Sequence, residues 1–178
     1  MSRPPLIFLT GPPGIGKTTA VERIARKLRE QGYRVAGIIT REIRRHGRRE
    51  GFVLIDLASG KQWELARREA STPIRVGSYG MYPEALEEAA RILQQALQEA
   101  DVIVIDEVGP MELAHPAFVE TLRKVLASGK PVIGTVHYRS THPLAQRIRR
   151  EAHLVRLTHG NRDRTPDQVV AFFPPINT

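Results

Sequence analysis

Residues 9–20 read LTGPPGIGKTTA, and this stretch decides the fold expected for the chain. A short apolar run, residues 6–9, has the composition of a strand buried on both faces of a parallel sheet. After the stretch, apolar residues recur from Ala20 to Leu28 at the spacing of one helical face. The stretch therefore joins a buried strand to an amphipathic helix, which we expect to end near Gly32.

The glycines, lysine and threonine of this stretch have the spacing of a phosphate-binding loop. From Gly11 to Thr18 they match the pattern G-x-x-x-x-G-K-[ST], in the strand-to-helix context that the pattern requires. Glycines allow successive backbone amides to turn around an anion, and the start of the helix adds more amides. We expect Lys17 to reach the β- and γ-phosphates and act in catalysis, and the Thr18 hydroxyl to ligate Mg²⁺. The expected nucleotide-binding residues of the loop are Gly11, Pro12, Pro13, Gly14, Ile15, Gly16, Lys17, Thr18 and Thr19.

Composition excludes several classes of protein and site. The 178 residues, 41% of them hydrophobic, suffice for one domain, residues 1–178, with a sizeable core. No apolar run has the length of a signal peptide or a membrane helix, which predicts a cytoplasmic protein without a membrane partner. Because the chain has no cysteine, any metal must be held by oxygen or histidine.

The charge of the chain favours polyanionic partners. The formal net charge is +8, and arginines are concentrated in REIRRHGRRE, residues 41–50. Nucleotides and nucleic acids both satisfy this charge balance.

Strand and helix patterns alternate along most of the chain. Buried strands are expected at residues 102–105, 132–136 and 154–157, and helices at 83–99, 118–126, 142–150 and from a capping box at 165–168. The alternation predicts a three-layer α/β fold, with a mostly parallel sheet, helices on both faces and right-handed crossovers.

Residues 35–67 depart from this alternation. Strand-like segments lie at 35–39, 51–57 and 62–65, with turn signals at 45–47 and 58–60. The segment is therefore expected to form a β-meander inserted into the α/β fold.

Two carboxylates end the expected strand at residues 102–105. Asp106 and Glu107 lie where a parallel sheet binds its ligands, at the carboxyl ends of its strands. We expect Asp106 to hold Mg²⁺ opposite Thr18. The neighbouring Glu107 can accept a proton from a water that attacks the γ-phosphate. Both are counted as nucleotide-binding, as is Gly109, where the chain can turn sharply beside the γ-phosphate.

At this point the sequence resembles a known family, the small P-loop nucleoside-triphosphatases first described from thermophiles and at times labelled nucleotide kinases. The resemblance covers almost the whole chain and rests on GPPGIGKTT at 11–19, TRE with GRREGF between 40 and 52, VGSYG at 76–80, VIDEVGPMEL at 104–113, GTVHYR at 134–139 and NRD at 161–163. It implies a RecA-like fold, with strand 132–136 between the acidic strand and the first strand. It also implies Mg²⁺-dependent hydrolysis of ATP, GTP and other nucleoside triphosphates, with broad base tolerance.

Three residues of the last two motifs, GTVHYR and NRD, are weaker candidates. Arg139 follows an expected strand and could stabilise charge on the γ-phosphate, or it could be solvated. Asn161 could reach the base or ribose, or its side chain could bond to the local backbone. His137 has no second histidine at ligand spacing, so it is not assigned as a metal ligand.

Arg44, Arg45, Arg48 and Arg49 surround the expected turn at 45–47. We expect exposed, solvated charge there, with little effect on hydrolysis of free ATP. Nucleic-acid binding is the less favoured alternative, because no aromatic residue is interleaved with these arginines.

The leading hypothesis is a Mg²⁺-dependent nucleoside-triphosphatase. A nucleotide or nucleoside kinase is the first alternative, and it requires an acceptor pocket that the segment 35–67 could supply. A nucleic-acid-associated switch that hydrolyses nucleotide slowly is the second alternative.

Overall fold

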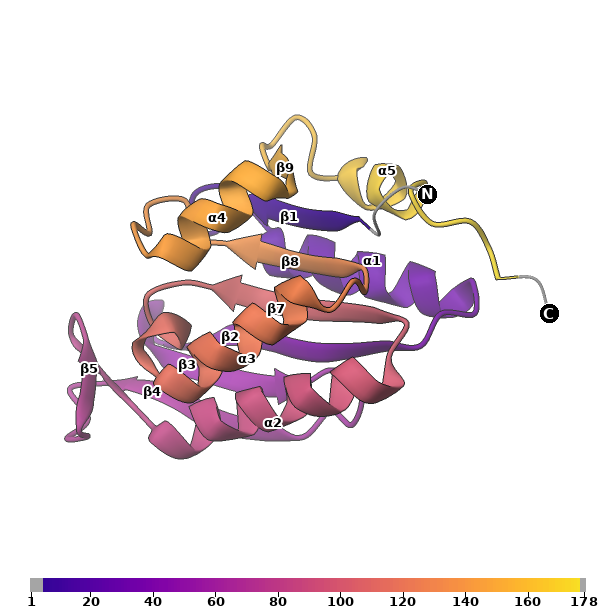
Figure 1. The fold of residues 1–178 in the computed structure, drawn as a ribbon. Coiled ribbons are helices and arrows are strands. Elements are labelled where there is room, and N and C mark those ends of the chain that lie inside the picture. The colour runs from indigo at the N-terminus through magenta and orange to yellow at the C-terminus, as the bar shows by residue number, and fades with distance from the viewer. Residues whose placement is uncertain (1–4, 177–178) are drawn as a thin grey trace.

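The structure is a computed structural model that describes residues 5–176, and it contains one mixed sheet with helices on both faces (Figure 1). The strands are β1 (Leu6–Thr10), β2 (Val35–Arg45), β3 (Arg48–Asp56), β4 (Gln62–Arg68), β5 (Ile74–Val76), β6 (Tyr79–Met81), β7 (Val102–Val108), β8 (Val132–Val136) and β9 (His153–Arg156). The helices are α1 (Lys17–Glu30), α2 (Pro83–Glu99), α3 (Pro116–Ala127), α4 (Pro143–Glu151) and α5 (Thr165–Val170), with a 3₁₀ turn at Glu112–Ala114. The nine strands have the order β5-β6-β4-β3-β2-β7-β8-β1-β9.

One half of the sheet is parallel and forms the α/β part of the fold, with the strands β2, β7, β8, β1 and β9 side by side. Strand β8 lies between β7 and β1, which confirms the order implied by the family resemblance. Because β1 leads into the glycine-rich loop and β7 ends in the acidic pair, this order brings both to the same edge of the sheet.

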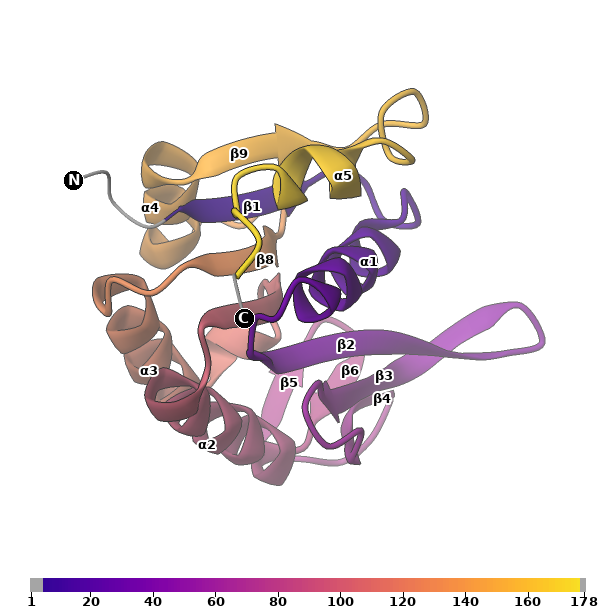
Figure 2. The same ribbon diagram turned by 90° about the vertical axis from the view of Figure 1, so that its right-hand side faces the viewer.

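Helices cover the two faces of the sheet in separate groups (Figures 1 and 2). The core on one face contains the apolar side chains of α2, α3 and α4, among them Leu86, Leu122 and Ile148. The core on the other face contains those of α1 and α5, such as Ile24 and Val169. The sheet is therefore buried on both sides, as the apolar composition of its central strands predicts.

The antiparallel half of the sheet is larger than expected. Strands β2, β3 and β4 form the expected meander, but antiparallel pairing continues through β6 and β5 to Met81. The meander itself runs from Val35 to Arg68, close to the expected 35–67, and the two further strands were not expected. Short strands such as β5 and β6 carry little periodic signal, and the pairing of β6 with β4 joins them to the sheet.

The capping box expected at residues 165–168 was also wrong. The N-cap residue of α5 is Arg164, and Thr165 lies inside the helix. The Thr165 hydroxyl donates to the carbonyl oxygen of Asn161 at 2.9 Å, so it bonds backward along the chain instead of capping the first turn.

Candidate active site

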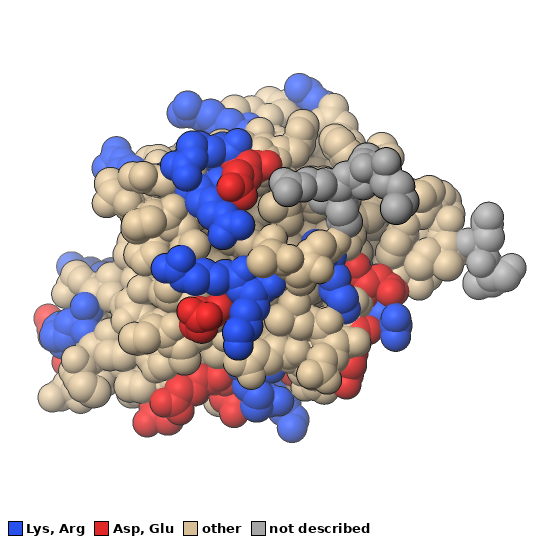
Figure 3. Space-filling view, viewed as in Figure 1, with Lys and Arg blue, Asp and Glu red and all other residues tan. Residues whose placement is uncertain are grey.

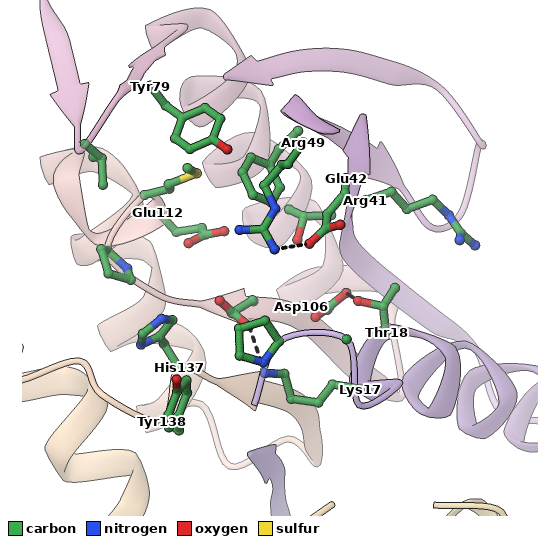
Figure 4. Close-up of a pocket in the computed structure, with 18 of the residues that line it drawn as sticks. Lys17, Thr18, Arg41, Glu42, Arg49, Tyr79, Asp106, Glu112, His137 and Tyr138 are labelled. Carbon is green, nitrogen blue, oxygen red and sulfur yellow. Dashed lines mark hydrogen bonds and ion pairs between the residues drawn. The ribbon is translucent and has the colours of Figure 1, made fainter. Parts of the chain in front are cut away.

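A pocket of about 540 Å³ lies at the carboxyl edge of β1, β7 and β8 (Figure 4). One wall is the glycine-rich loop with the start of α1, and the floor is the end of β7. The opposite wall comes from β2, β3 and the segment of β5 and β6. Residues that line it include Lys17, Thr18, Arg49, Asp106 and Glu107. The parallel and antiparallel halves of the sheet thus share one site.

The glycine-rich loop presents backbone amides to the pocket. Gly14 and Gly16 have φ values of 81° and 105°, which residues with a Cβ rarely adopt. Helix α1 begins at Lys17, and its first helical hydrogen bond runs from the Ala20 amide to the carbonyl of Gly16 at 3.0 Å. The amides that precede Ala20 in α1 therefore have no helical partner and suit an anion.

The Lys17 side chain lies between the loop and the acidic strand. Its Nζ donates to the carbonyl oxygen of Gly11 at 2.6 Å and lies 3.8 Å from Oε2 of Glu107. The ammonium group is therefore held at the mouth of the loop, where it faces both the anion-binding amides and a carboxylate.

Asp106 and Thr18 meet across the pocket floor. Asp106 is 1% exposed and accepts hydrogen bonds from Oγ1 of Thr18 at 2.8 Å and Oγ1 of Thr135 at 2.7 Å. Burial raises the pKa of Asp106 to about 6, although both hydroxyl groups oppose the shift. The Thr18 hydroxyl and the Asp106 carboxylate are hard oxygen groups of the kind that can bind Mg²⁺ alongside phosphate oxygens.

Glu107 occupies a different environment from its neighbour. Burial raises the pKa of its carboxyl group, while the positive charges of Lys17 and Arg49 lower it. Because it lines the pocket next to Lys17, its carboxylate is placed beside the anion-binding loop.

Sequence reasoning missed Glu112, which is buried in the same pocket. It begins the 3₁₀ turn after β7 and is 5% exposed. Burial, and next the charge of Glu107, hold the pKa of Glu112 well above its usual range. A Cβ added to Gly109 would lie 2.9 Å from Oε1 of Glu107 and 3.4 Å from Oε2 of Glu112. The backbone at Gly109 thus passes between two carboxylates with little room for a side chain, and its expected role in nucleotide binding stays a prediction. A single glutamate in the sequence does not indicate that its side chain is buried.

Sequence reasoning also misplaced Arg49. It was grouped with the exposed arginines of the hairpin tip, but it lines the pocket, and its Nη2 donates to Oε1 of Glu42 at 2.5 Å. Its guanidinium carbon lies 5.5 Å from the centre of the Phe52 ring. Neighbouring side chains of a strand face opposite sides, and this alternation is the signal that could have separated Arg49 from Arg48.

An aromatic and apolar wall closes the pocket opposite the loop. The rings of Phe52 and Tyr79 meet edge to face with their centres 5.5 Å apart, and Val76 and Met111 line the same wall. Sequence analysis assigned none of these residues to the site, because they come from β3, the β5–β6 hairpin and the segment after β7.

The weaker candidates lie at the margin of the site or outside it. Arg139 is exposed, its guanidinium carbon lies 5.0 Å from the ring centre of Tyr138, and it does not line the pocket formed by the described residues. Asn161 uses Oδ1 to accept from the amide of Thr158 at 2.7 Å and Nδ2 to donate to the carbonyl of Arg156 at 2.8 Å. Its side chain thus makes the local backbone bonds that were the alternative reading.

His137 lines the pocket beside Tyr138. Burial lowers the pKa of His137, and the nearby charges of Lys17 and Arg149 lower it further. Its Nδ1 accepts a hydrogen bond from the amide of Arg139 at 3.2 Å, so the ring is held at the pocket wall. Within residues 5–176, no cluster of three or more His, Asp or Glu residues is arranged to hold a metal ion.

Comparison with known proteins shows the family. A family model described as NTPase (NTPase_1) matches residues 6–170. The chain belongs to this NTPase family. The nucleoside-triphosphatase THEP1 of Methanopyrus kandleri is 45% identical over 167 residues, which are 92% of each chain. The protein of the same name from Methanocaldococcus jannaschii is 38% identical over 165 residues, 92% of this chain and 94% of the relative.

Two solved structures have the same fold. The crystal structure of THEP1 from the hyperthermophile Aquifex aeolicus superposes with a TM-score of 0.81 at 35% identity, covering 94% of this chain and 97% of that one. The solution structure of a human cancer-related nucleoside triphosphatase gives 0.78 at 32% identity, covering 98% and 100%. The family and the fold are therefore shown by sequence and by structure.

Proposed function

We propose that this protein is a Mg²⁺-dependent nucleoside-triphosphatase that hydrolyses ATP, GTP and other nucleoside triphosphates to the diphosphate and phosphate. The observation that carries the proposal is the meeting of Thr18 with Asp106 beside Lys17 and Glu107, at the mouth of the glycine-rich loop. The relatives named nucleoside-triphosphatase THEP1 support the same activity.

Each side chain has a distinct part in the proposed reaction. The loop amides and Lys17 bind the phosphates and hold the γ-phosphate beside the carboxylate of Glu107. Thr18 and Asp106 would hold Mg²⁺, which neutralises phosphate charge when it is bound. Glu107 accepts the proton of the attacking water as the bond from the γ-phosphorus to the leaving oxygen breaks. Burial suits Glu107 to this role, because its raised pKa makes the carboxylate a stronger base at neutral pH.

A phosphotransferase is the second candidate, and the aromatic wall favours it. One attacking water needs no apolar surface, whereas Phe52, Tyr79 and Met111 offer a wall for an organic acceptor on the side of the pocket opposite the loop. In that reaction a hydroxyl group would take the place of water, with Glu107 in the same role.

A product assay tests both candidates. The protein is incubated with ATP, GTP, CTP or UTP, with and without Mg²⁺, and without an acceptor. We expect all four substrates to yield free phosphate and the nucleoside diphosphate in equal amounts, and only with Mg²⁺. Phosphate release that appears only after a nucleoside or nucleotide is added, with a phosphorylated product, would favour the phosphotransferase instead.

A further inference from the structure

Arg49 reaches the pocket from the hairpin of β2 and β3, far in sequence from the glycine-rich loop. The hairpin turns at His46 and Gly47, whose φ values of 50° and 75° are those of a tight turn that suits a twisted hairpin. This turn sets Arg49 opposite Arg44 in the register of the two strands. Figure 4 shows the Arg49 guanidinium directed into the pocket, on the wall opposite Lys17.

The guanidinium is held on one side and has free donors on the other. Glu42 accepts from Nη2 of Arg49 at 2.5 Å and also binds Nε of Arg44 at 2.9 Å, so Glu42 is itself oriented. The Phe52 ring supports the face of the guanidinium. The Nε atom of Arg49 is buried and has no hydrogen-bond partner among the described residues. The guanidinium group itself is directed into the pocket, where its charge and planar donors suit an anion.

The position of Arg49 also shows in its effect on Glu107. The charges of Lys17 and Arg49 both lower the pKa of that carboxyl group, against the effect of burial. Two cations therefore act on the place where the attacking water would lie, Lys17 from the loop and Arg49 from the hairpin.

We propose that Arg49 is a catalytic residue that binds the γ-phosphate oxygens as charge develops on them during hydrolysis. The inference rests on the proposed triphosphatase function. As the water oxygen bonds to the γ-phosphorus, the bond to the leaving oxygen breaks and the water proton passes to Glu107. The negative charge on the transferred group is then shared between Lys17 and Arg49. An arginine supplied by the same chain is known to serve such transfers in other phosphate-loop enzymes.

This assignment replaces the role expected for Arg139. Arg139 is exposed and stacks on Tyr138, whereas Arg49 lines the pocket and is held by Glu42. Between the two arginines, only Arg49 lines the pocket, with its guanidinium directed into it (Figure 4).

Arg49→Ala tests the proposal, with Arg48→Ala as the matched control from the adjacent, exposed position on the same strand. We expect Arg49→Ala to lower kcat for ATP by about 10²–10³-fold, as loss of one transition-state donor does, with KM changed by less than about fivefold. Arg48→Ala, alone or combined with Arg45→Ala, should keep kcat within about twofold of the parent, since these two side chains lie outside the pocket. A thermal melt of each variant shows whether it is folded.

Two further measurements separate a catalytic role from a structural one. Arg49→Lys should recover part of the lost kcat, because it keeps the charge but not the planar donors. Affinity for ADP with aluminium fluoride, which mimics the transferred phosphoryl group, should fall more in Arg49→Ala than affinity for a non-hydrolysable ATP analogue.

Equal loss of both affinities, or a kcat for Arg49→Ala equal to that of Arg48→Ala, would overturn the assignment of Arg49. If the parent protein itself releases no phosphate from any nucleoside triphosphate, the proposed function fails, and that outcome is distinct from failure of the inference.

Discussion

At the scale of the residue, Asp106 and Glu107 are neighbours in sequence but have different partners. Asp106 is almost fully buried and accepts from two threonine hydroxyls, whereas Glu107 faces Lys17 across 3.8 Å. The environment of Asp106 suits a metal ligand with a fixed position, and the environment of Glu107 suits a base that takes a proton. Replacing either carboxylate by the corresponding amide should therefore have a different effect on the enzyme.

We predict that Glu107→Gln lowers kcat by about 10²–10⁴-fold, the usual contribution of a positioned base, while nucleotide still binds. Asp106→Asn should instead raise the Mg²⁺ concentration needed for half-maximal rate, because it weakens the proposed metal site. Rates measured over a Mg²⁺ titration distinguish the two variants. A Glu107→Gln enzyme with the parental rate, or one that merely needs more Mg²⁺, would show that the roles are assigned wrongly.

Glu112 makes a prediction about stability and pH. Its pKa is raised in the folded protein, so the folded state holds its proton more tightly than the unfolded state does. Its contribution to stability is therefore complete below its unfolded pKa, about 4.3, and is lost as pH rises through the folded value. We expect the melting temperature of Glu112→Gln, minus that of the parent, to increase as pH is raised from about 4 to 8.

Glu87→Gln is the matched control for this experiment, because Glu87 is an exposed glutamate on α2. Its melting temperature should follow that of the parent at every pH. A constant difference between Glu112→Gln and the parent would mean that Glu112 does not titrate differently in the folded protein.

At the scale of the element, β2 joins the two halves of the sheet, and a glycine lies where it approaches β7. Strand β2 pairs with β7 on one side, in parallel, and with β3 on the other, antiparallel. Gly37 pairs in register with Val104 and has a φ of 144°. A Cβ at this position would lie 1.9 Å from the carbonyl oxygen of Val104. The close approach of β2 to β7 therefore depends on the absence of a side chain.

We predict that Gly37→Ala destabilises the protein by at least about 3 kcal/mol, because the added atom meets backbone that cannot move aside. Gly60→Ala is the control, since Gly60 has a φ of 76° but a Cβ there meets nothing within 4 Å. That change should cost only about 1–2 kcal/mol, the strain of a left-handed residue. Unfolding in guanidinium chloride measures both, and similar losses in the two variants would contradict the steric explanation.

At the scale of the whole molecule, the formal net charge is +8, and a number of the basic side chains are paired with carboxylates. Figure 3 shows basic side chains on the face that carries α2, α3 and α4, with acidic side chains among them. Surface pairs such as Arg34 with Asp101 and Arg147 with Glu151 account for part of the arginine content. On this face, the mixture of charges favours solvated side chains over a nucleic-acid-binding surface. Among residues 5–176, no helix combines the length and the hydropathy needed to cross a membrane.

We predict that nucleotide binding stabilises the whole domain, because the site is built from both halves of the sheet. A non-hydrolysable ATP analogue with Mg²⁺ at 100 times its Kd adds about 2.7 kcal/mol, which corresponds to a rise in melting temperature of roughly 5–11 °C. Lys17→Ala should lose this rise. Lys27→Ala, which removes a half-buried lysine of the same helix that pairs with Asp167 outside the pocket, should keep it. A full rise in Lys17→Ala would show that the nucleotide binds elsewhere.

The sequence alone determined those parts of the fold and site whose signals lie within a few neighbouring residues. Spacing from Gly11 to Thr18 predicts the phosphate-binding loop, and the helix at 83–99 has the bounds that its apolar stripe predicts. The acidic pair at the end of β7 is local in the same way. The roles proposed for Lys17, Thr18, Asp106 and Glu107 stay predictions until the variants are measured.

Only the tertiary structure decided which distant residues share the pocket. Arg49, Phe52 and Tyr79 reach it through the register of β2, β3, β4 and β6, and no spacing within one segment specifies that register. Glu112 is buried because the chain after β7 folds back over the acidic pair, which an isolated glutamate in the sequence does not reveal. The physical reason is that strand pairing and burial depend on contacts between segments far apart in the chain, whereas a loop that binds phosphate is specified by its own backbone.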